Sequence, residues 1–215
     1  MTSSASKPIL YLITPGATNS ATTSLSSSFK SIVSQISCAV DAGIDFVQLR
    51  EKSLTTRALF ELTERAVQIV QGTATRILVN DRADVAKAAA AHGVHLSTQS
   101  ICAATIRKCF GADFVIGVST HSIAEARQAR NDRADFVVFG PVFPTTSKQA
   151  YGPAVGLDAL SQVSEMLSPL PVLALGGITS QNAGQCLRAG ASGIAGISLF
   201  SGPEEIRSLR AKLAR

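Results

Sequence analysis

Residues that could bind a highly charged anion follow two short apolar segments of the sequence. Arg50 and Lys52 come directly after one such segment, and Asp81 follows the next one along the chain. Several cations can hold a diphosphate in a partly desolvated cleft, and Mg²⁺ is usually bound by one or two carboxylates together with phosphate oxygens and water. We therefore predict a diphosphate site that uses Arg50, Lys52 and the more distant Lys148, with Asp81 as a ligand of Mg²⁺.

Each of these assignments has a structural alternative. Arg50 and Glu51 would form an ion pair on a solvated rim, a common arrangement for charged residues at the end of a strand. Asp81 would cap the helix that follows it, because aspartate is a favoured residue at the N-terminus of a helix. The residue types and their spacing leave both alternatives open.

Three glycines, Gly176, Gly177 and Gly196, belong to two apolar segments near the end of the chain. Glycine lets the backbone approach an oxyanion closely and adopt a positive φ. In barrels of parallel strands, the loops after the last two strands commonly bind a phosphate through backbone N–H groups. We predict a phosphate site at these glycines. The alternative is that they only form ordinary turns.

A long segment without a helical or extended pattern, 140–156, carries several hydroxyl residues and a lysine. Loops longer than about 12–15 residues in a compact domain are usually functional or disordered. His121 follows an apolar segment and stands beside hydroxyl residues, so we predict an acid–base or substrate-binding role for it. His95 lies inside an apolar segment and His92 precedes it, and we interpret both as structural.

Helical and extended patterns alternate along the chain and would position these residues. Phe29, Ile32, Ile36 and Val40, for example, recur at helical spacing, and short apolar runs separate such helices. Strands that are apolar along their whole length are typical of a parallel sheet covered on both faces. Eight extended segments alternating with eight helical ones predict an α/β protein with a single (β/α)8 TIM barrel over residues 1–215.

A barrel gathers the carboxyl ends of its strands at one face, where active sites lie. It would therefore bring the two predicted anion sites together. The alternative, an open doubly wound sheet, would carry a GxGxxG turn after the first strand, and YLITPGAT contains none. Residues 15–28 are small and polar and predict a mobile loop after the first strand. Ser122 and Ser180 are placed to cap two of the helices.

The composition narrows the class of protein. With 215 residues, of which 46% are hydrophobic and 16% charged, the chain can bury a sizeable core, and bulk disorder is excluded. It lacks an apolar run of ~18 residues and a signal-peptide pattern, so we expect a cytoplasmic protein without a membrane partner. The net charge is +5, but the basic residues are scattered, so we expect no nucleic-acid partner. The four cysteines lack metal-ligand spacing and are predicted to be core residues.

The chain resembles the thiamine-phosphate synthase and thiazole tautomerase superfamily in seven segments, which follow one another in order between about residue 9 and about residue 200. The segments are VQLREK (47–52), NDR (80–82), GVHL (93–96), GVSTHS (117–122), FGPVFPTTSK (139–148), YGPAVGL (151–157) and LALGGIT (173–179). Thiamine-phosphate synthases join a hydroxymethylpyrimidine diphosphate to a thiazole phosphate and release pyrophosphate. The resemblance thus implies a transferase of thiamine biosynthesis with two small phosphorylated substrates.

Carried over position by position, the resemblance also implies a role for most of the residues named above. Asp81 would hold the cofactor, Mg²⁺. The pyrimidine diphosphate would be held by Gln48, Arg50, Lys52, Asn80, Ser119 and Lys148. The thiazole phosphate would be held by Thr145, Thr146, Ser147, Gly177, Ile197 and Ser198, with Gly176 beside them. The predicted catalytic residues are His121, Ser119 and Lys148.

One departure from the synthase pattern concerns the metal. Synthases usually continue GVHLGQED, in which the last aspartate is a second magnesium ligand, whereas this chain has GVHLSTQS with Ser100 in that place. Thiazole tautomerases share the fold but need no metal, and in them a histidine in the position of His121 moves a proton. A metal-independent tautomerase is therefore the alternative function, and a non-catalytic relative that binds thiazole phosphate is a third. The sequence leaves the oligomeric state open, a homo-oligomer included.

Overall fold

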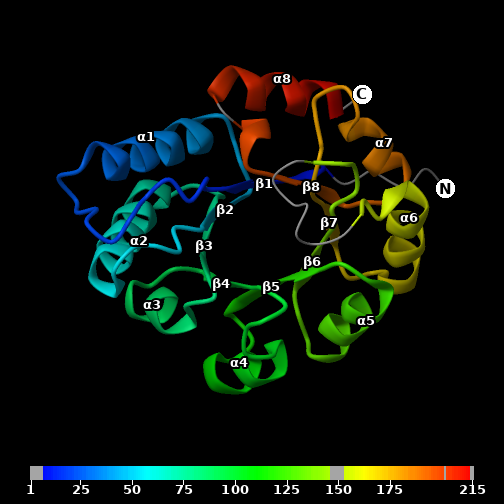
Figure 1. Ribbon diagram of the computed structural model, residues 1–215, viewed down its shortest axis with the longest axis horizontal. Coiled ribbons are helices and arrows are strands. Elements are labelled where there is room, and N and C mark those ends of the chain that lie inside the picture. The colour runs from blue at the N-terminus through cyan, green and yellow to red at the C-terminus, as the bar shows by residue number, and fades with distance from the viewer. Residues whose placement is uncertain (1–6, 146–152, 201, 214–215) are drawn as a thin grey trace.

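The computed structural model describes residues 7–145, 153–200 and 202–213. Its eight strands form a closed barrel in which each strand pairs in parallel with the next and β8 pairs with β1. Eight α-helices surround the barrel in the described part of the chain (Figure 1). The predicted (β/α)8 TIM barrel is confirmed. None of the described helices is long and apolar enough to cross a membrane.

The strands and helices alternate along the chain. The strands are β1 (Ile9–Ile13), β2 (Phe46–Leu49), β3 (Arg76–Asn80), β4 (Gly93–Leu96), β5 (Val115–Thr120), β6 (Phe136–Phe139), β7 (Val172–Ala174) and β8 (Gly193–Gly196). The helices are α1 (Ser27–Asp41), α2 (Thr56–Val70), α3 (Ala83–Ala88), α4 (Ala103–Phe110), α5 (Ile123–Asn131), α6 (Gly156–Leu167), α7 (Ala183–Arg188) and α8 (Pro203–Leu213). A short 3₁₀ helix, η2 (Ser198–Phe200), precedes α8.

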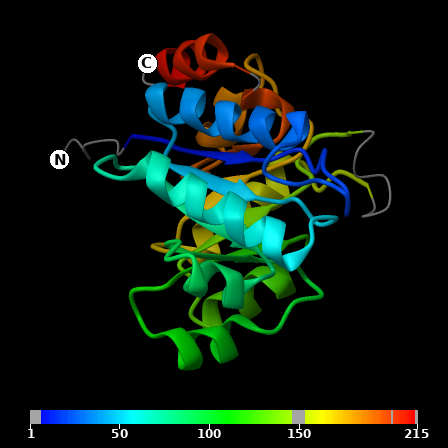
Figure 2. The ribbon, with the colours of Figure 1, turned by 90° about the vertical axis from the view of Figure 1, so that its left-hand side faces the viewer.

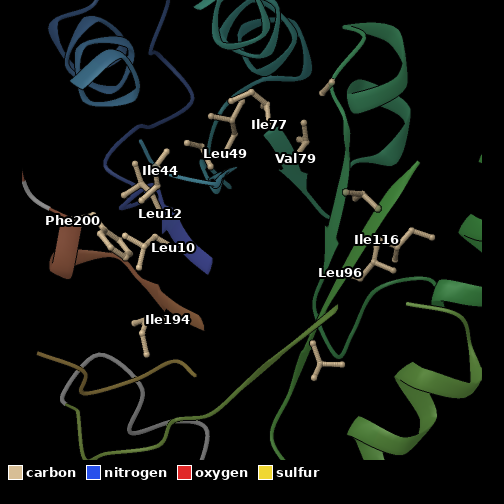
Figure 3. Packing of buried hydrophobic residues seen from close by; sticks show 14 of the residues in the cluster. Leu10, Leu12, Ile44, Leu49, Ile77, Val79, Leu96, Ile116, Ile194 and Phe200 are labelled. Atoms are coloured by element: carbon tan, nitrogen blue, oxygen red, sulfur yellow. The ribbon is translucent and has the colours of Figure 1, made fainter. Parts of the chain in front are cut away.

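Side chains alternate between the two faces of each strand and so build two apolar layers. Outward-facing residues such as Leu10 and Leu12 of β1 and Ile77 and Val79 of β3 pack with the helices in one large buried cluster, part of which is seen in Figure 3. Inward-facing residues such as Tyr11 fill the barrel in a second cluster. Because both faces are buried, the strands are apolar along their length, as predicted for a covered parallel sheet.

The two predicted helix caps have different outcomes. Ser122 caps α5, since its side chain accepts a hydrogen bond from a backbone N–H of the first turn at 3.2 Å. The prediction for Ser180 is wrong, because α7 begins only at Ala183 and Asn182 occupies the N-cap position. The side-chain oxygen of Asn182 instead accepts a hydrogen bond from the backbone N–H of Thr179 at 2.7 Å. The segment before α7 therefore forms a turn, and the helix begins late.

The cysteines also differ from the prediction of four core residues. Cys186 is fully buried, but Cys38 is half-buried, and Cys102 and Cys109 are exposed. Cys102 directly precedes α4 and Cys109 lies within it. This helix buries only the face that carries Ala103 and Ile106, so both cysteines are exposed. Burial raises the pKa of the Cys186 thiol to about 11.

The loop between β1 and α1 is shorter than the predicted segment 15–28, because α1 begins at Ser27. In Figure 2 this loop, drawn in blue, lies at the right-hand end of the barrel. Two of its side chains, Thr18 and Thr22, are buried. The composition of the segment predicts a mobile loop, and the structure buries these two side chains of it in the protein. Its mobility stays a prediction.

Candidate active site

A cavity of about 430 Å³ opens at the carboxyl end of the barrel. Its walls come from strand ends and from the loops that follow them, and its volume is typical of small-molecule sites. The predicted site residues that line it are Gln48, Arg50, Lys52, Asn80, Ser119, His121, Ile197 and Ser198. Closure of the barrel thus brings together residues from distant parts of the sequence.

The alternation of side chains explains which residue of each strand reaches this cavity. Phe46 of β2 and Leu78 of β3 pack with the cluster inside the barrel. Gln48 and Asn80 lie two residues further along their strands and therefore face the same interior, one layer closer to the mouth. Gln48 is only 2% exposed, so its amide must be hydrogen-bonded within the protein or to a ligand.

A chain of hydrogen bonds links three of these predicted residues. The Nε2 of Gln48 donates to Oδ1 of Asn80 at 2.8 Å, and the Nδ2 of Asn80 donates to Oδ2 of Asp81 at 2.8 Å. An ionised carboxylate only accepts hydrogen bonds, so Asp81 determines which way both amides point. Asp81 thereby orients two side chains of the cavity wall.

The other oxygen of Asp81 is held by the loop after β4. Its Oδ1 accepts hydrogen bonds from the backbone N–H of Ser97 at 2.9 Å and from the hydroxyl of Ser100. Burial acts to raise the pKa of the Asp81 carboxyl, but the hydrogen bonds from Ser100 and Ser97 and the charge of Lys52 outweigh it, so the pKa lies below its ordinary value. The helix-cap alternative fails among the described residues, because none of these partners is in α3.

The charged end of β2 is not the ion-paired rim that we considered as an alternative. Glu51 is 3% exposed and accepts hydrogen bonds from the backbone N–H groups of Gly16 and Thr18, at 2.9 and 3.1 Å. Among the described residues, neither Arg50 nor Lys52 forms a salt bridge. Both cations line the cavity, and their predicted role toward an anion stays a prediction.

Two glycines of the predicted phosphate site are required by the packing of the protein itself. Gly176 and Gly177 have φ values of 99° and 62°. A Cβ at Gly177 would come within 2.7 Å of the Pro144 carbonyl oxygen, and a Cβ at Gly176 within 2.5 Å of the Pro141 side chain. The loop after β6 therefore packs directly on these glycines. This packing explains the glycines without a ligand, and their role toward phosphate stays a prediction.

The remaining predicted residues are placed as follows. Thr145 is half-buried in the loop after β6 and is not among the residues that line the cavity. Thr146, Ser147 and Lys148 lie outside the described residues. Ile197 and Ser198 come directly after β8 and line the cavity, with β1 between β8 and β2 in the barrel.

Of the predicted catalytic residues, the structure describes Ser119, which lies in β5, and His121, which directly follows this strand. The ring Nδ1 of His121 donates a hydrogen bond to the carbonyl oxygen of Gly140, because a carbonyl can only accept. In a neutral ring the acceptor nitrogen is then Nε2. Ser119 is half-buried, and its Oγ lies 2.9 Å from Nε2 of His95, a residue that we interpreted as structural.

Several residues of the cavity wall escaped the sequence analysis. They are Ile13, Pro15, Ser97, Thr98, Gln99 and Leu175. Each of them follows or ends a strand, so their position after a strand was the available signal. None of the six carries a charge that would bind an anion, and the hydroxyls of Ser97 and Thr98 follow β4 without a charged neighbour in sequence. Glu51 was missed for a different reason, since only the folded loop supplies its donors.

A second cavity, of about 840 Å³, lies at the opposite end of the barrel, where Ile9, Phe46 and Arg76 begin their strands. Asp135, a charged residue of this cavity, has a structural role. Its Oδ2 accepts hydrogen bonds from Arg107 and from a backbone N–H of β5. TIM-barrel chemistry takes place at the carboxyl ends of the strands. We therefore assign the candidate site to the cavity of about 430 Å³.

A family model described as thiamine monophosphate synthase matches residues 10–200. The chain belongs to the thiamine monophosphate synthase family. A putative thiamine-phosphate synthase of Geobacter sulfurreducens is 41% identical over 186 residues, which cover 86% of this chain and 87% of that protein. The thiamine-phosphate synthase of Roseiflexus castenholzii is 38% identical over 80% of this chain and 75% of that protein. Thiamine phosphate pyrophosphorylase from Pyrococcus furiosus superposes with a TM-score of 0.80 at 29% identity, over 97% of this chain and 98% of that one.

Other members of the thiamine monophosphate synthase family are longer. The chain covers only 31% and 33% of two bifunctional plant enzymes of thiamine biosynthesis, from rice and Arabidopsis thaliana. The match of the family model includes every predicted site residue, from Gln48 to Ser198. Membership confirms the resemblance on which the residue roles were carried over. The roles themselves stay predictions.

Proposed function

We propose that this chain is a thiamine-phosphate synthase, a cytoplasmic transferase that couples hydroxymethylpyrimidine diphosphate with thiazole phosphate and releases pyrophosphate. The observation that carries the proposal is the hydrogen-bonded chain from Gln48 through Asn80 to Asp81, beside the cations Arg50 and Lys52. Two amides and two cations thus line one cavity, and the Asp81 carboxylate accepts a hydrogen bond from one of these amides. Two relatives that are 41% and 38% identical to this chain carry the name of this activity.

Gln48 would recognise the pyrimidine through a fixed polarity. Asp81 accepts from Asn80, and Asn80 in turn accepts from the Nε2 of Gln48. The carbonyl oxygen of Gln48 is then available to a substrate as an acceptor, and the second hydrogen of its Nε2 as a donor. A pyrimidine that presents an N–H group would be bound through the oxygen.

The residues around Asp81 fit Mg²⁺ bound through one carboxylate oxygen. The two oxygens of a carboxylate offer about four acceptor positions. Within the described residues, Oδ1 accepts two hydrogen bonds and Oδ2 accepts one, so Oδ2 retains a position for a metal. The described residues contain no group of three or more histidine, cysteine or acidic residues that could hold a metal by themselves. The diphosphate and water would therefore complete the coordination.

The reaction breaks the bond between the pyrimidine methylene carbon and the diphosphate oxygen, and the electron pair leaves with the diphosphate. The ring nitrogen of the thiazole then forms the new bond to this carbon. When bound, Mg²⁺ would supply charge that stabilises the leaving diphosphate. Arg50, Lys52 and Lys148 would stabilise the same charge from the protein. Ser119 would contact the pyrimidine diphosphate at the end of β5.

The thiazole phosphate would lie at the end of the cavity formed by Ile197 and Ser198, with Gly176 and Gly177 nearby. The resemblance adds Thr145, Thr146 and Ser147 to this proposed subsite. Its supporting observation is that Ile197 and Ser198 line the same cavity as Gln48 and Arg50. Two substrates that must form a bond would thus share one chamber, which favours the reaction by proximity.

One observation favours the second candidate, a metal-independent thiazole tautomerase. The Nδ1 of His121 is held by the Gly140 carbonyl, and His121 lines the cavity. A histidine with one nitrogen held in this way is suited to proton transfer at the other. The hydroxyl of Ser100 beside Asp81, in place of a second carboxylate, also agrees with a site that needs no metal.

Two parallel assays separate the candidates. In the first, the full chain receives both thiamine precursors and Mg²⁺, and thiamine phosphate and pyrophosphate are measured with and without a chelator. In the second, isomerisation of the thiazole carboxylate is measured without metal. We expect coupling that depends on Mg²⁺ and survives in His121→Ala. Isomerisation that His121→Ala slows on the order of 10²–10⁴-fold, without any coupling, would establish the tautomerase instead.

A further inference from the structure

A histidine below the cavity has no role in the reaction proposed above. His95 of β4 is 2% exposed, and its Nε2 lies 2.9 Å from the Oγ of Ser119 at the end of β5. Ser119 lines the cavity and His95 does not. His95 is therefore in contact with the site through the serine.

Residues of three other strands build a close-fitting space for the His95 ring. Tyr11 of β1 and Phe136 of β6 pack around it, with ring centroids 5.6 and 6.1 Å from that of the imidazole. Gly117 of β5 is the register partner of His95. A Cβ at Gly117 would come within 2.8 Å of His95 Nδ1 and within 2.4 Å of Phe136. The glycine thus leaves the space that the two rings occupy, and their packing limits rotation of the imidazole.

We propose that His95 is a positioning residue for Ser119. The hydrogen bond from a ring fixed by packing would hold the serine hydroxyl in one rotamer before substrate binds. The pyrimidine diphosphate would then meet an oriented hydroxyl and would not bear the cost of ordering it. This inference rests on the proposed function, in which Ser119 touches that substrate. If His95 served packing alone, any aromatic residue could replace it, and no ring nitrogen would need to face the serine.

The contact itself can be observed by NMR of the protein labelled with ¹⁵N-histidine. The sequence contains three histidines, so His92→Gln and His121→Gln assign the side-chain signals by elimination. We expect Ser119→Ala to shift the Nε2 signal of His95. The matched control is Tyr11→Phe, which removes a buried hydroxyl that has no partner among the described residues. This control should leave the Nε2 signal close to its wild-type position.

The consequence for the site is measured with a double-mutant cycle. His95→Phe keeps an aromatic ring and removes Nε2, whereas His95→Gln keeps an amide that reaches toward Ser119. We expect His95→Phe to weaken the binding of inorganic diphosphate with Mg²⁺, measured by calorimetry, and to lower kcat/KM roughly two- to tenfold, the usual worth of one hydrogen bond. His95→Gln should recover most of this loss. In a Ser119→Ala background, His95→Phe should have almost no further effect.

Three results would overturn the proposal. The first is an unchanged Nε2 signal in Ser119→Ala, and the second is an equal loss from His95→Phe with and without Ser119, which indicates packing alone. The third is a wild-type protein that does not bind diphosphate at all. If the wild type binds diphosphate but does not couple the precursors, the proposed function is wrong. The double-mutant cycle of His95 and Ser119, measured by diphosphate binding, then still tests the role of His95. If His95→Phe does not fold, His95→Gln and the NMR experiment decide.

Discussion

The buried carboxylate of Glu51 accepts two hydrogen bonds from Thr18, one from the backbone N–H at 3.1 Å and one from the hydroxyl at 2.8 Å. Its other oxygen accepts from the backbone N–H of Gly16 at 2.9 Å. Glu51 directly follows Arg50, and Gly16 directly follows Pro15, and both of these neighbours line the cavity. One carboxylate therefore connects the loop after β1 to the end of β2 at the mouth of the barrel.

Glu51→Gln should loosen this loop and lower the free energy of unfolding. A glutamine retains one acceptor oxygen but turns an NH₂ group toward backbone donors that then lack a partner. We expect a loss of about 1–3 kcal/mol in urea unfolding, together with faster amide exchange at Gly16 and Thr18. Glu61→Gln is the matched control, because Glu61 forms an exposed pair with Arg57 and its loss should cost under about 1 kcal/mol. Equal losses in the two variants would contradict the anchoring role of Glu51.

Asp81→Asn should reduce coupling far more than it reduces stability. Asparagine keeps the shape and tolerates the φ of 58° at this position. It removes the charge that would bind Mg²⁺ and places a second NH₂ group against that of Asn80, which disturbs the orientation of Gln48. We expect turnover to fall on the order of 10²-fold or more, with the melting temperature lowered by a few degrees. Full activity in a folded variant would eliminate Asp81 as an essential ligand.

Ser100→Asp should create a site that binds Mg²⁺ without diphosphate. In the wild type the Ser100 hydroxyl donates to Asp81, whereas an aspartate there would place two carboxylates in contact and would repel Asp81 in the absence of a cation. We expect the variant to melt at a lower temperature in chelator and to gain more from Mg²⁺ than the wild type does. The Mg²⁺ concentration for half-maximal coupling should also fall. The same Mg²⁺-dependent gain in melting temperature in both proteins would count against a metal position at Asp81.

Gly177→Ala separates the packing role of this glycine from its predicted role toward phosphate. The new Cβ would lie 2.7 Å from the Pro144 carbonyl oxygen, so the loop after β6 must move. Gly72→Ala is the matched control, because its φ of 75° is similar but a Cβ there meets nothing within 4 Å. In urea unfolding, we expect Gly72→Ala to cost about 1–2 kcal/mol and Gly177→Ala to cost about 1–3 kcal/mol more.

Calorimetry with thiazole phosphate completes this experiment. Gly177→Ala should bind the ligand more weakly than the wild type, and Gly72→Ala should bind it equally well. If Gly177→Ala is destabilised but keeps its full affinity, the glycine serves the packing of the loop alone.

The buried thiol of Cys186 should make stability depend on pH in the alkaline range. Because the folded state raises the pKa of this thiol to about 11, the folded protein keeps a proton that the unfolded chain loses earlier. The stabilisation is therefore full below the ordinary pKa of cysteine and is lost as the pH rises through about 11. Urea unfolding between pH 8 and pH 10 should show a steeper decline in the wild type than in Cys186→Ala. Parallel curves would contradict this assignment.

The sequence by itself determined the architecture and part of the site. Strands that are apolar along their whole length, alternating with amphipathic helices, require a parallel sheet covered on both faces, and eight repeats close it into a barrel. Gln48, Asn80 and Ser119 stand at or next to the carboxyl ends of buried strands, the end at which a barrel gathers its site residues. The family motifs then supplied the substrates that such residues would bind.

Only the tertiary structure decided which partner each polar group finds. Glu51 has the same neighbours in sequence whether it forms a surface ion pair or holds the loop after β1, and the donors of that loop lie 33 and 35 positions away. His95 looks like a core residue until β4 and β5 pair and bring its Nε2 to Ser119. The spacing of apolar residues along a helix or strand indicates which of its faces is buried, because the apolar face is the one that packs against the rest of the protein. Hydrogen bonds depend on distance and angle between atoms that are remote in the sequence, and closure of the barrel sets these.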